Sequence, residues 1–111
     1  MKLTHEDYDQ VSVVAIRGEL HAEECDTFRE EMNKRLEQDV RDFVLNLAET
    51  ESIDSQGLEA LLWLQDRCAE QLGQVRLAHA SPSVREVLRV TRLAGRLDCH
   101  DDVDAAITSL R

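Results

Sequence analysis

One short polar segment, Asp54-Ser55-Gln56-Gly57, stands between an apolar run of strand length and the most hydrophobic helical pattern in the chain. Asp54 suits the N-cap of that helix, because its carboxylate can accept a hydrogen bond from a free amide of the first turn. Ser55 would then be the first helical residue, with its hydroxyl outside the core and near the positive end of the helix dipole. A serine presented in this way can carry a phosphate group.

Enzymatic chemistry finds little support elsewhere in the sequence. The histidines are four in number, His5, His21, His79 and His100, and show no metal-binding spacing; Cys-x-x-Cys and glycine-rich phosphate loops are also absent. Ser55 lacks the Gly-x-Ser-x-Gly context of a hydrolase nucleophile. Asp54 is explained more simply as a helix cap than as an acid or base, and His79, at the end of an apolar strand, as a structural histidine. We therefore expect no enzyme, no metal and no cofactor.

The helix that follows this segment is predicted over about 55–71, with Gly73 supplying its C-terminal stop. Its inward face is apolar at helical spacing and comprises Leu58, Leu61, Leu62, Cys68, Ala69 and Leu72. Glu59 and Trp63 follow Ser55 at i+4 and i+8, on a different side. An outward aromatic residue beside an outward serine indicates a protein-docking surface. The alternative is that Trp63 packs over a neighbouring loop or helix.

Strand and helix patterns alternate along the whole chain. Strands are expected over 2–8, 11–16, 41–47 and 75–79, and a short edge strand ends near residue 99. Helices are expected over about 22–38 and 101–110, and a short one opens at Ser81-Pro82-Ser83. Strands 11–16 and 41–47 are separated by one helix, so we expect them to be parallel. The alternation indicates an α/β layer fold.

Length, net charge and cysteine content limit the classes of protein and of partner that the sequence allows. The 111 residues suffice for a single domain, spanning 1–111. A net charge of −10 disfavours nucleic acid and favours a partner with a basic docking surface. No apolar run approaches the ~18 residues of a membrane helix, and the N-terminus does not resemble a signal peptide. Cys25, Cys68 and Cys99 are interpreted as free thiols, two of them on apolar helix faces, in a reducing compartment. A cytoplasmic protein without membrane insertion is expected.

Four segments together resemble one known family. They are Val14-Ala15-Ile16-Arg17-Gly18-Glu19-Leu20, Phe43-Val44-Leu45-Asn46-Leu47, Ile53-Asp54-Ser55-Gln56-Gly57-Leu58 and Ala80-Ser81-Pro82-Ser83-Val84-Arg85-Glu86-Val87-Leu88. This pattern resembles the STAS family of anti-sigma factor antagonists and sulfate-transporter C-terminal domains. Asp-Ser-x-Gly-Leu between strand and helix is its most specific part. The resemblance implies a small mixed β-sheet of four to five strands packed with about four helices.

The resemblance also implies a function. Ser55 matches the serine that an anti-sigma factor serine kinase phosphorylates, and family antagonists bind that kinase only when unphosphorylated. A phosphatase restores the binding form, and the chain would act as a monomer or weak dimer. The implied partner-binding residues surround this serine and are His21, Asp54, Ser55, Gln56, Gly57, Glu59 and Trp63.

Two positions depart from the family pattern, and two other functions stay open. Gln56 replaces a second Ser or Thr, so that Ser55 is the acceptor here, and His21 replaces an Asp that many antagonists carry after Gly-Glu-Leu. Some STAS proteins are never phosphorylated and serve as scaffolds or as accessory subunits of transport or secretion complexes. Nucleotide binding has also been proposed for the family, although this chain has no glycine-rich loop to support it.

Overall fold

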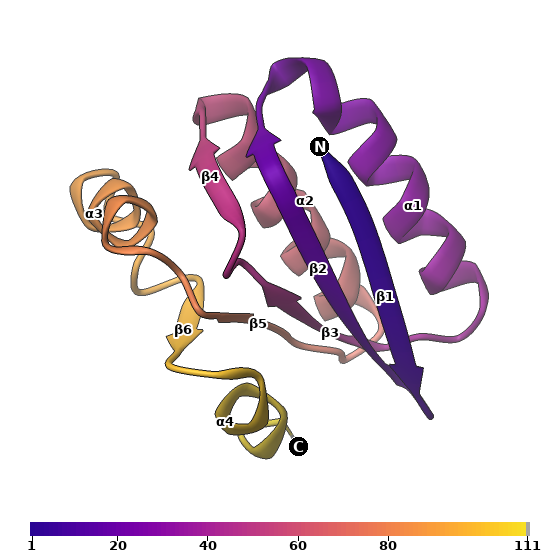
Figure 1. Cartoon of the computed structure of the whole chain (residues 1–111). Helices are drawn as coiled ribbons and strands as arrows, with labels where there is room; N and C mark the ends of the chain where they lie inside the picture. Colours follow the sequence, from indigo (N-terminus) through magenta and orange to yellow (C-terminus); the bar gives the residue numbers. More distant parts are fainter. Residues whose placement is uncertain (111) are drawn as a thin grey trace.

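A six-stranded mixed sheet forms the framework of the computed structural model, which describes residues 1–110 (Figure 1). Its strands are β1 (Lys2–Tyr8), β2 (Val11–Leu20), β3 (Asp42–Asn46), β4 (Thr50–Ile53), β5 (Val75–Ala78) and β6 (Asp98–His100). Their order is β1-β2-β3-β5-β6, and β4 pairs with the far end of β2. The β1–β2 pair is antiparallel and the other pairs are parallel, so the expected parallel pairing of the second and third strands is confirmed.

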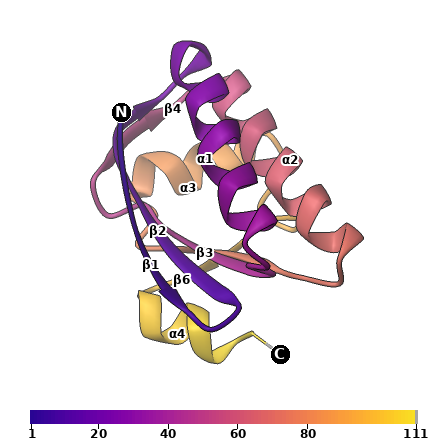
Figure 2. The ribbon, with the colours of Figure 1, turned by 90° about the vertical axis from the view of Figure 1, so that its right-hand side faces the viewer.

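Helices cover both faces of the sheet. They are the 3₁₀ turn η1 (Ala22–Glu24), α1 (Cys25–Glu37), α2 (Ser55–Glu70), α3 (Pro82–Val90) and α4 (Val103–Thr108). Figure 2 shows α1 and α2 side by side on one face and α4 on the other. The main core lies under α1 and α2, and a smaller cluster of Val44, Ala78 and Ala106 lies under α4. The α/β prediction is confirmed, and so is the opening of α3, where the Ser81 hydroxyl accepts a hydrogen bond from the Val84 amide at 3.2 Å.

The sheet has one strand more than sequence patterns indicate. β4 escapes prediction because three of its four residues, Thr50 to Ser52, are polar. Thr50 is nevertheless buried, and its hydroxyl donates to the Ile16 carbonyl oxygen at 2.7 Å. β2 correspondingly continues to Leu20, beyond the predicted end at residue 16, because β4 pairs with this extension.

The C-terminal end of α2 corrects one part of the predicted apolar face. Ala69 and Leu72 are exposed, and Leu72, at 86% exposure, lies beyond the helix in a left-handed conformation. The Gly73 amide donates to the Cys68 carbonyl oxygen at 2.7 Å and so closes the helix end. Gly73 is required for close approach, since a Cβ there would lie 2.0 Å from the Arg41 carbonyl oxygen. The left-handed turn therefore falls on Leu72 and carries its side chain away from the core.

His79, expected as a structural histidine at the end of an apolar strand, lies just beyond that strand. β5 ends at Ala78, and His79 is exposed with a φ of 58°. Its amide donates to the His100 carbonyl oxygen at 3.2 Å, which ties the end of β5 to β6. His79 thus contributes to the structure through its backbone amide.

The three cysteines are free, as expected, and two of them are buried. Burial raises the pKa of the Cys68 thiol to about 12, and it also raises the pKa of the Cys99 thiol, which is only half-buried. At pH 8 the thiolate fraction of Cys68 is therefore on the order of 10⁻⁴. We expect iodoacetamide to modify Cys99 in the native protein and to leave Cys68 unmodified until urea unfolds the chain. Peptide mass spectrometry measures both rates, and equal native rates would contradict the packing described here.

Candidate partner-binding site

The candidate site lies where the ends of β2 and β4 meet the first turn of α2, near the top of Figure 1. Leu20 pairs with Ile53, and the Leu20 carbonyl oxygen accepts a hydrogen bond from the Asp54 amide at 3.3 Å. The chain turns into η1 after Leu20 and into α2 after Asp54. Two strand ends therefore fix the start of α2 against the η1 turn.

Asp54 joins these two segments through its carboxylate. Oδ1 accepts a hydrogen bond from the Gly57 amide at 2.8 Å, which confirms the predicted N-cap. Oδ2 accepts one from the Ala22 amide at 3.0 Å, a contact across 32 residues of sequence. The bond from Gly57, followed by that from Ala22, holds the pKa of Asp54 below its ordinary value. Both carboxylate oxygens thus accept hydrogen bonds from backbone amides of the site.

Ser55 is the first residue of α2 and is exposed, as its position in the sequence predicts. Gln56 and Glu59 are exposed beside it. Asp54 is the cap, so the first-turn amides and the positive end of the helix dipole lie close to the Ser55 backbone. The local field therefore favours a negative group on this serine.

Gly57 allows the strand end to approach the helix. It is buried, and a Cβ at this position would lie 2.2 Å from the Leu20 carbonyl oxygen and 2.8 Å from Cγ2 of Ile53. No real Cβ tolerates such distances, so any larger residue would push α2 away from β2. Gly57 therefore positions the site and, being buried, offers no side chain to a partner.

Trp63 is less outward than its spacing predicts. It is half-buried and packs at the edge of the main core. The Arg67 guanidinium lies 5.6 Å from the centre of its ring, and Arg67 also donates to Asn33 of α1 at 3.1 Å. Part of the Trp63 ring is therefore at the surface, and the rest packs against the core and beneath Arg67 of the same helix.

His21 belongs to a polar cluster that the sequence does not reveal. Its Nε2 lies 2.8 Å from the Ser52 hydroxyl, which itself donates to Glu19 at 3.3 Å. The Ser52 hydroxyl therefore links the imidazole of His21 to the carboxylate of Glu19. Ser52 and Glu19 are absent from the predicted site because β4, which brings them beside His21, was not predicted.

The profile of the STAS domain family matches residues 2–106. This chain is a STAS domain. Among curated proteins, BtrV of Bordetella bronchiseptica, a candidate anti-sigma factor antagonist, is 25% identical over 91 residues, which cover 82% of this chain and 78% of BtrV. The regulatory role in this comparison is therefore that of BtrV.

Solved structures share this STAS fold. The structure of TM1081 of Thermotoga maritima, also a candidate anti-sigma factor antagonist, matches with a TM-score of 0.91 and 23% identity, covering 98% of this chain and 94% of that one. Unphosphorylated SpoIIAA, an anti-sigma factor antagonist, matches with a TM-score of 0.80 and 21% identity over 94% and 92% of the two chains. The phosphorylated form of SpoIIAA, a Bacillus cell-fate determinant, matches with a TM-score of 0.75 and 18% identity over 96% and 98%.

The described part of this STAS domain has no cluster of His, Cys, Asp and Glu that would hold a metal ion. Within residues 1–110, every helix is too short or too polar to cross a bilayer.

The Asp54 cap gives the site a pH dependence of defined sign. A carboxyl group whose pKa is lowered by folding stabilises the fold above its unfolded pKa of about 4, and the contribution disappears as pH falls through the folded pKa. We expect Asp54→Asn to lower the urea midpoint at pH 7 and to differ less from the wild type below about pH 4. Glu59→Gln, an exposed carboxylate on the same helix, serves as the control. A deficit for Asp54→Asn that stays constant with pH would contradict this role.

Proposed function

We propose that this STAS domain is an anti-sigma factor antagonist whose binding is switched by phosphorylation of Ser55. In the unphosphorylated state it binds an anti-sigma factor serine kinase through the surface around the start of α2. Phosphorylation of Ser55 releases it, and a phosphatase returns it to the binding form. The observation that carries this proposal is the exposed serine at the first position of a capped helix.

The neighbours of Ser55 support its choice as the acceptor. Asp54 is held by two backbone amides and is not free to turn outward. Gln56, the next exposed residue, has no hydroxyl group. Ser52 is half-buried, and its hydroxyl is engaged with His21 and Glu19. Ser55 is therefore the hydroxyl at this surface that a kinase can reach.

Electrostatics support a switch at the interface rather than in the fold. A phosphate adds about −1.5 to −2 charges at pH 7. The helix dipole favours that charge by on the order of 1 kcal/mol, and repulsion from the nearby carboxylates of Asp54 and Glu59 opposes it in high dielectric. The two effects offset one another, so the fold is retained. Inside a docked interface, desolvation or repulsion of the same charge costs on the order of several kcal/mol.

The direct test is to incubate the chain with ATP and a lysate of its source organism, and then to map phosphate by mass spectrometry. We expect one phosphate on Ser55 and none in Ser55→Ala. Ser52→Ala is the matched control, since it removes the adjacent hydroxyl at the end of β4 and should leave the modification unchanged. An unmodified wild-type chain, or phosphate on another residue, would overturn the proposal and favour a STAS scaffold.

A further inference from the structure

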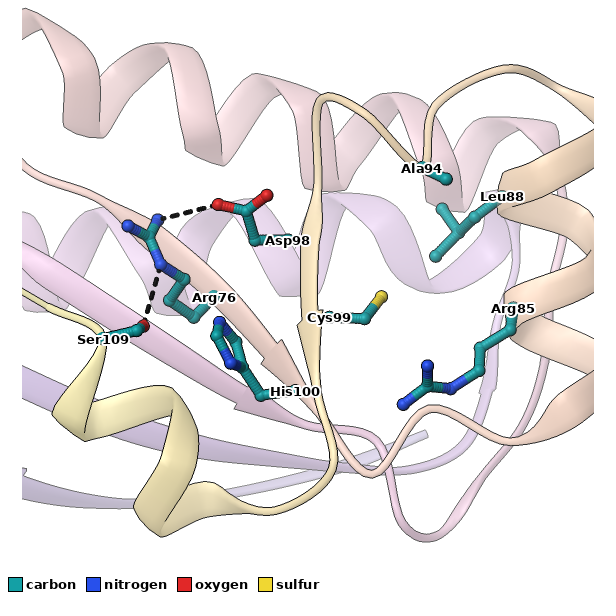
Figure 3. A pocket seen from close by; sticks show the side chains of 8 residues that line it. All are labelled: Arg76, Arg85, Leu88, Ala94, Asp98, Cys99, His100 and Ser109. Carbon is teal, nitrogen blue, oxygen red and sulfur yellow. Dashed lines mark hydrogen bonds and ion pairs between the residues drawn. The ribbon is translucent and has the colours of Figure 1, made fainter.

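A cavity of ligand size lies at the open edge of the sheet, and none of the residues discussed above for the α2 site lines it. Its volume is about 430 Å³, within the range of small-molecule sites. β6 pairs only with β5, so its outer edge is free within the described chain. Figure 3 shows Asp98 and His100 on one side of β6, beside Arg76, and Cys99 on the other, facing Leu88. The cavity thus joins a polar wall to an apolar one.

Arg76 supplies a nearly buried cation to the polar wall, with a side chain only 14% exposed. Its Nε donates to the Ser109 hydroxyl at 3.0 Å and its Nη1 to the Val75 carbonyl oxygen at 3.1 Å. Nη2 takes part in neither bond. Neutral oxygens therefore hold the guanidinium in place, and its charged neighbour is Asp98, whose Oδ2 lies 3.7 Å from Nη1.

Arg85 supplies a second guanidinium, from α3. Its Nε donates to the Ala80 carbonyl oxygen at 3.2 Å, which orients the side chain at the mouth of the cavity. Nη2 lies 3.5 Å from Asp101, and Nη1 takes part in neither contact. This arginine can therefore turn donors toward a ligand while its Nε stays anchored.

His100 adds an unmet hydrogen-bonding group. Its Nε2 is buried and has no hydrogen-bond partner among residues 1–110. A buried polar atom without a partner lowers the stability of the fold. The nitrogen is buried beneath the cavity surface, so His100 lines the cavity without offering this atom to a ligand.

The acidic residues of the cavity lie at its rim. Asp98 stands 3.7 Å from Arg76 and is 59% exposed, and Asp101 stands 3.5 Å from Arg85 and is 97% exposed. These separations exceed hydrogen-bond length, and exposed ion pairs contribute little. The rim carboxylates therefore compete only weakly with an anion inside the cavity.

We propose that this cavity binds a small organic acid. Its carboxylate would pair with Arg85, because guanidinium forks match planar carboxylates, and the charge of Arg76 on the other side of β6 would add to the attraction. Its apolar body would lie against Leu88 and Cys99. The proposal does not depend on phosphorylation of Ser55.

The test is an NMR titration of the folded chain with benzoate, phenyl phosphate and neutral benzyl alcohol as probes. For a probe of this size we expect a benzoate Kd on the order of 1 mM. The largest amide shifts should fall on residues 98–100 and on α3. Phenyl phosphate should bind more weakly than benzoate, and benzyl alcohol should give no saturable shift in this range.

Two arginines on the same helix provide a matched comparison. Arg85→Gln should weaken benzoate binding about tenfold, the loss of one charge-assisted hydrogen bond. Arg89→Gln removes an exposed arginine of α3 that pairs with Glu86 outside the cavity, and it should leave the Kd unchanged. Asp101→Asn removes the competing carboxylate and should tighten binding. Because this last variant gains affinity, a loss of folding cannot imitate the result.

Several outcomes would overturn the proposal. They are the absence of benzoate shifts at β6, equal binding of benzyl alcohol, binding of phenyl phosphate alone, an equal loss in Arg85→Gln and Arg89→Gln, and no gain in Asp101→Asn.

Discussion

Gly57→Ala should destabilise this STAS domain by about 3 kcal/mol, which corresponds to a fall in melting temperature of roughly 15 °C for a domain of this size. The reason is the backbone of β2: a Cβ at residue 57 would stand 2.2 Å from the Leu20 carbonyl oxygen. Alanine is the better helix former by about 1 kcal/mol, so the clash has to exceed that gain. It does, because the obstructing atom belongs to a paired strand and not to a flexible side chain.

Gly95→Ala is the matched control, since nothing lies within 4 Å of a Cβ built at residue 95. Its effect should stay within about 0.5 kcal/mol. Calorimetry measures both variants. If Gly57→Ala melted within a few degrees of the wild type, the start of α2 would not be fixed against β2 as described.

The same substitution should also disturb the geometry of the site. A helix pushed away from Leu20 carries Asp54 with it, so the bond from the Ala22 amide to Oδ2 lengthens. The Ala22 amide resonance should therefore move in NMR spectra of Gly57→Ala. In Gly95→Ala it should not.

Local signals were enough to predict the start of α2. A capping aspartate followed by apolar residues at helical spacing depends on neighbours in sequence, so Asp54 and Ser55 were placed as the structure has them. The same kind of signal predicted α3, where Ser81 caps the helix and Pro82 opens it.

What the sequence did not reveal depends on distant contacts. β4 is held by its pairing with β2 and by the buried Thr50 hydroxyl, and a polar tetrapeptide carries no sign of either. Without β4, the contact between His21 and Ser52 could not be predicted. The face of α2 was extended to Leu72 because helical spacing continues there. The helix stops earlier because Gly73 approaches the Arg41 backbone, which is a tertiary contact.

Ser55→Asp should lower the affinity for an anti-sigma factor kinase of the source genome by at least about tenfold, because a charge placed in a docked interface costs about several kcal/mol and each ~1.4 kcal/mol is tenfold. Ser55→Ala should bind as the wild type does. Ala105→Asp is the charge-matched control: it adds the same charge to an exposed position on α4, which covers the opposite face of the sheet from α2.

The melting temperature separates this switch from an unfolding effect. An acidic residue in the first turn of a helix is favoured by the dipole, so Ser55→Asp should melt within a few degrees of the wild type. Calorimetry and titration of the same samples then distinguish Gly57→Ala from Ser55→Asp. Gly57→Ala loses stability, whereas Ser55→Asp loses affinity alone. Equal affinities for the wild type, Ser55→Ala and Ser55→Asp, confirmed with the phosphorylated chain, would mean that the charge on Ser55 does not control binding. A surface at the electropositive start of a helix that tolerated a phosphate inside its complex would then be an anion-accepting interface, opposite in sign to the switch proposed here.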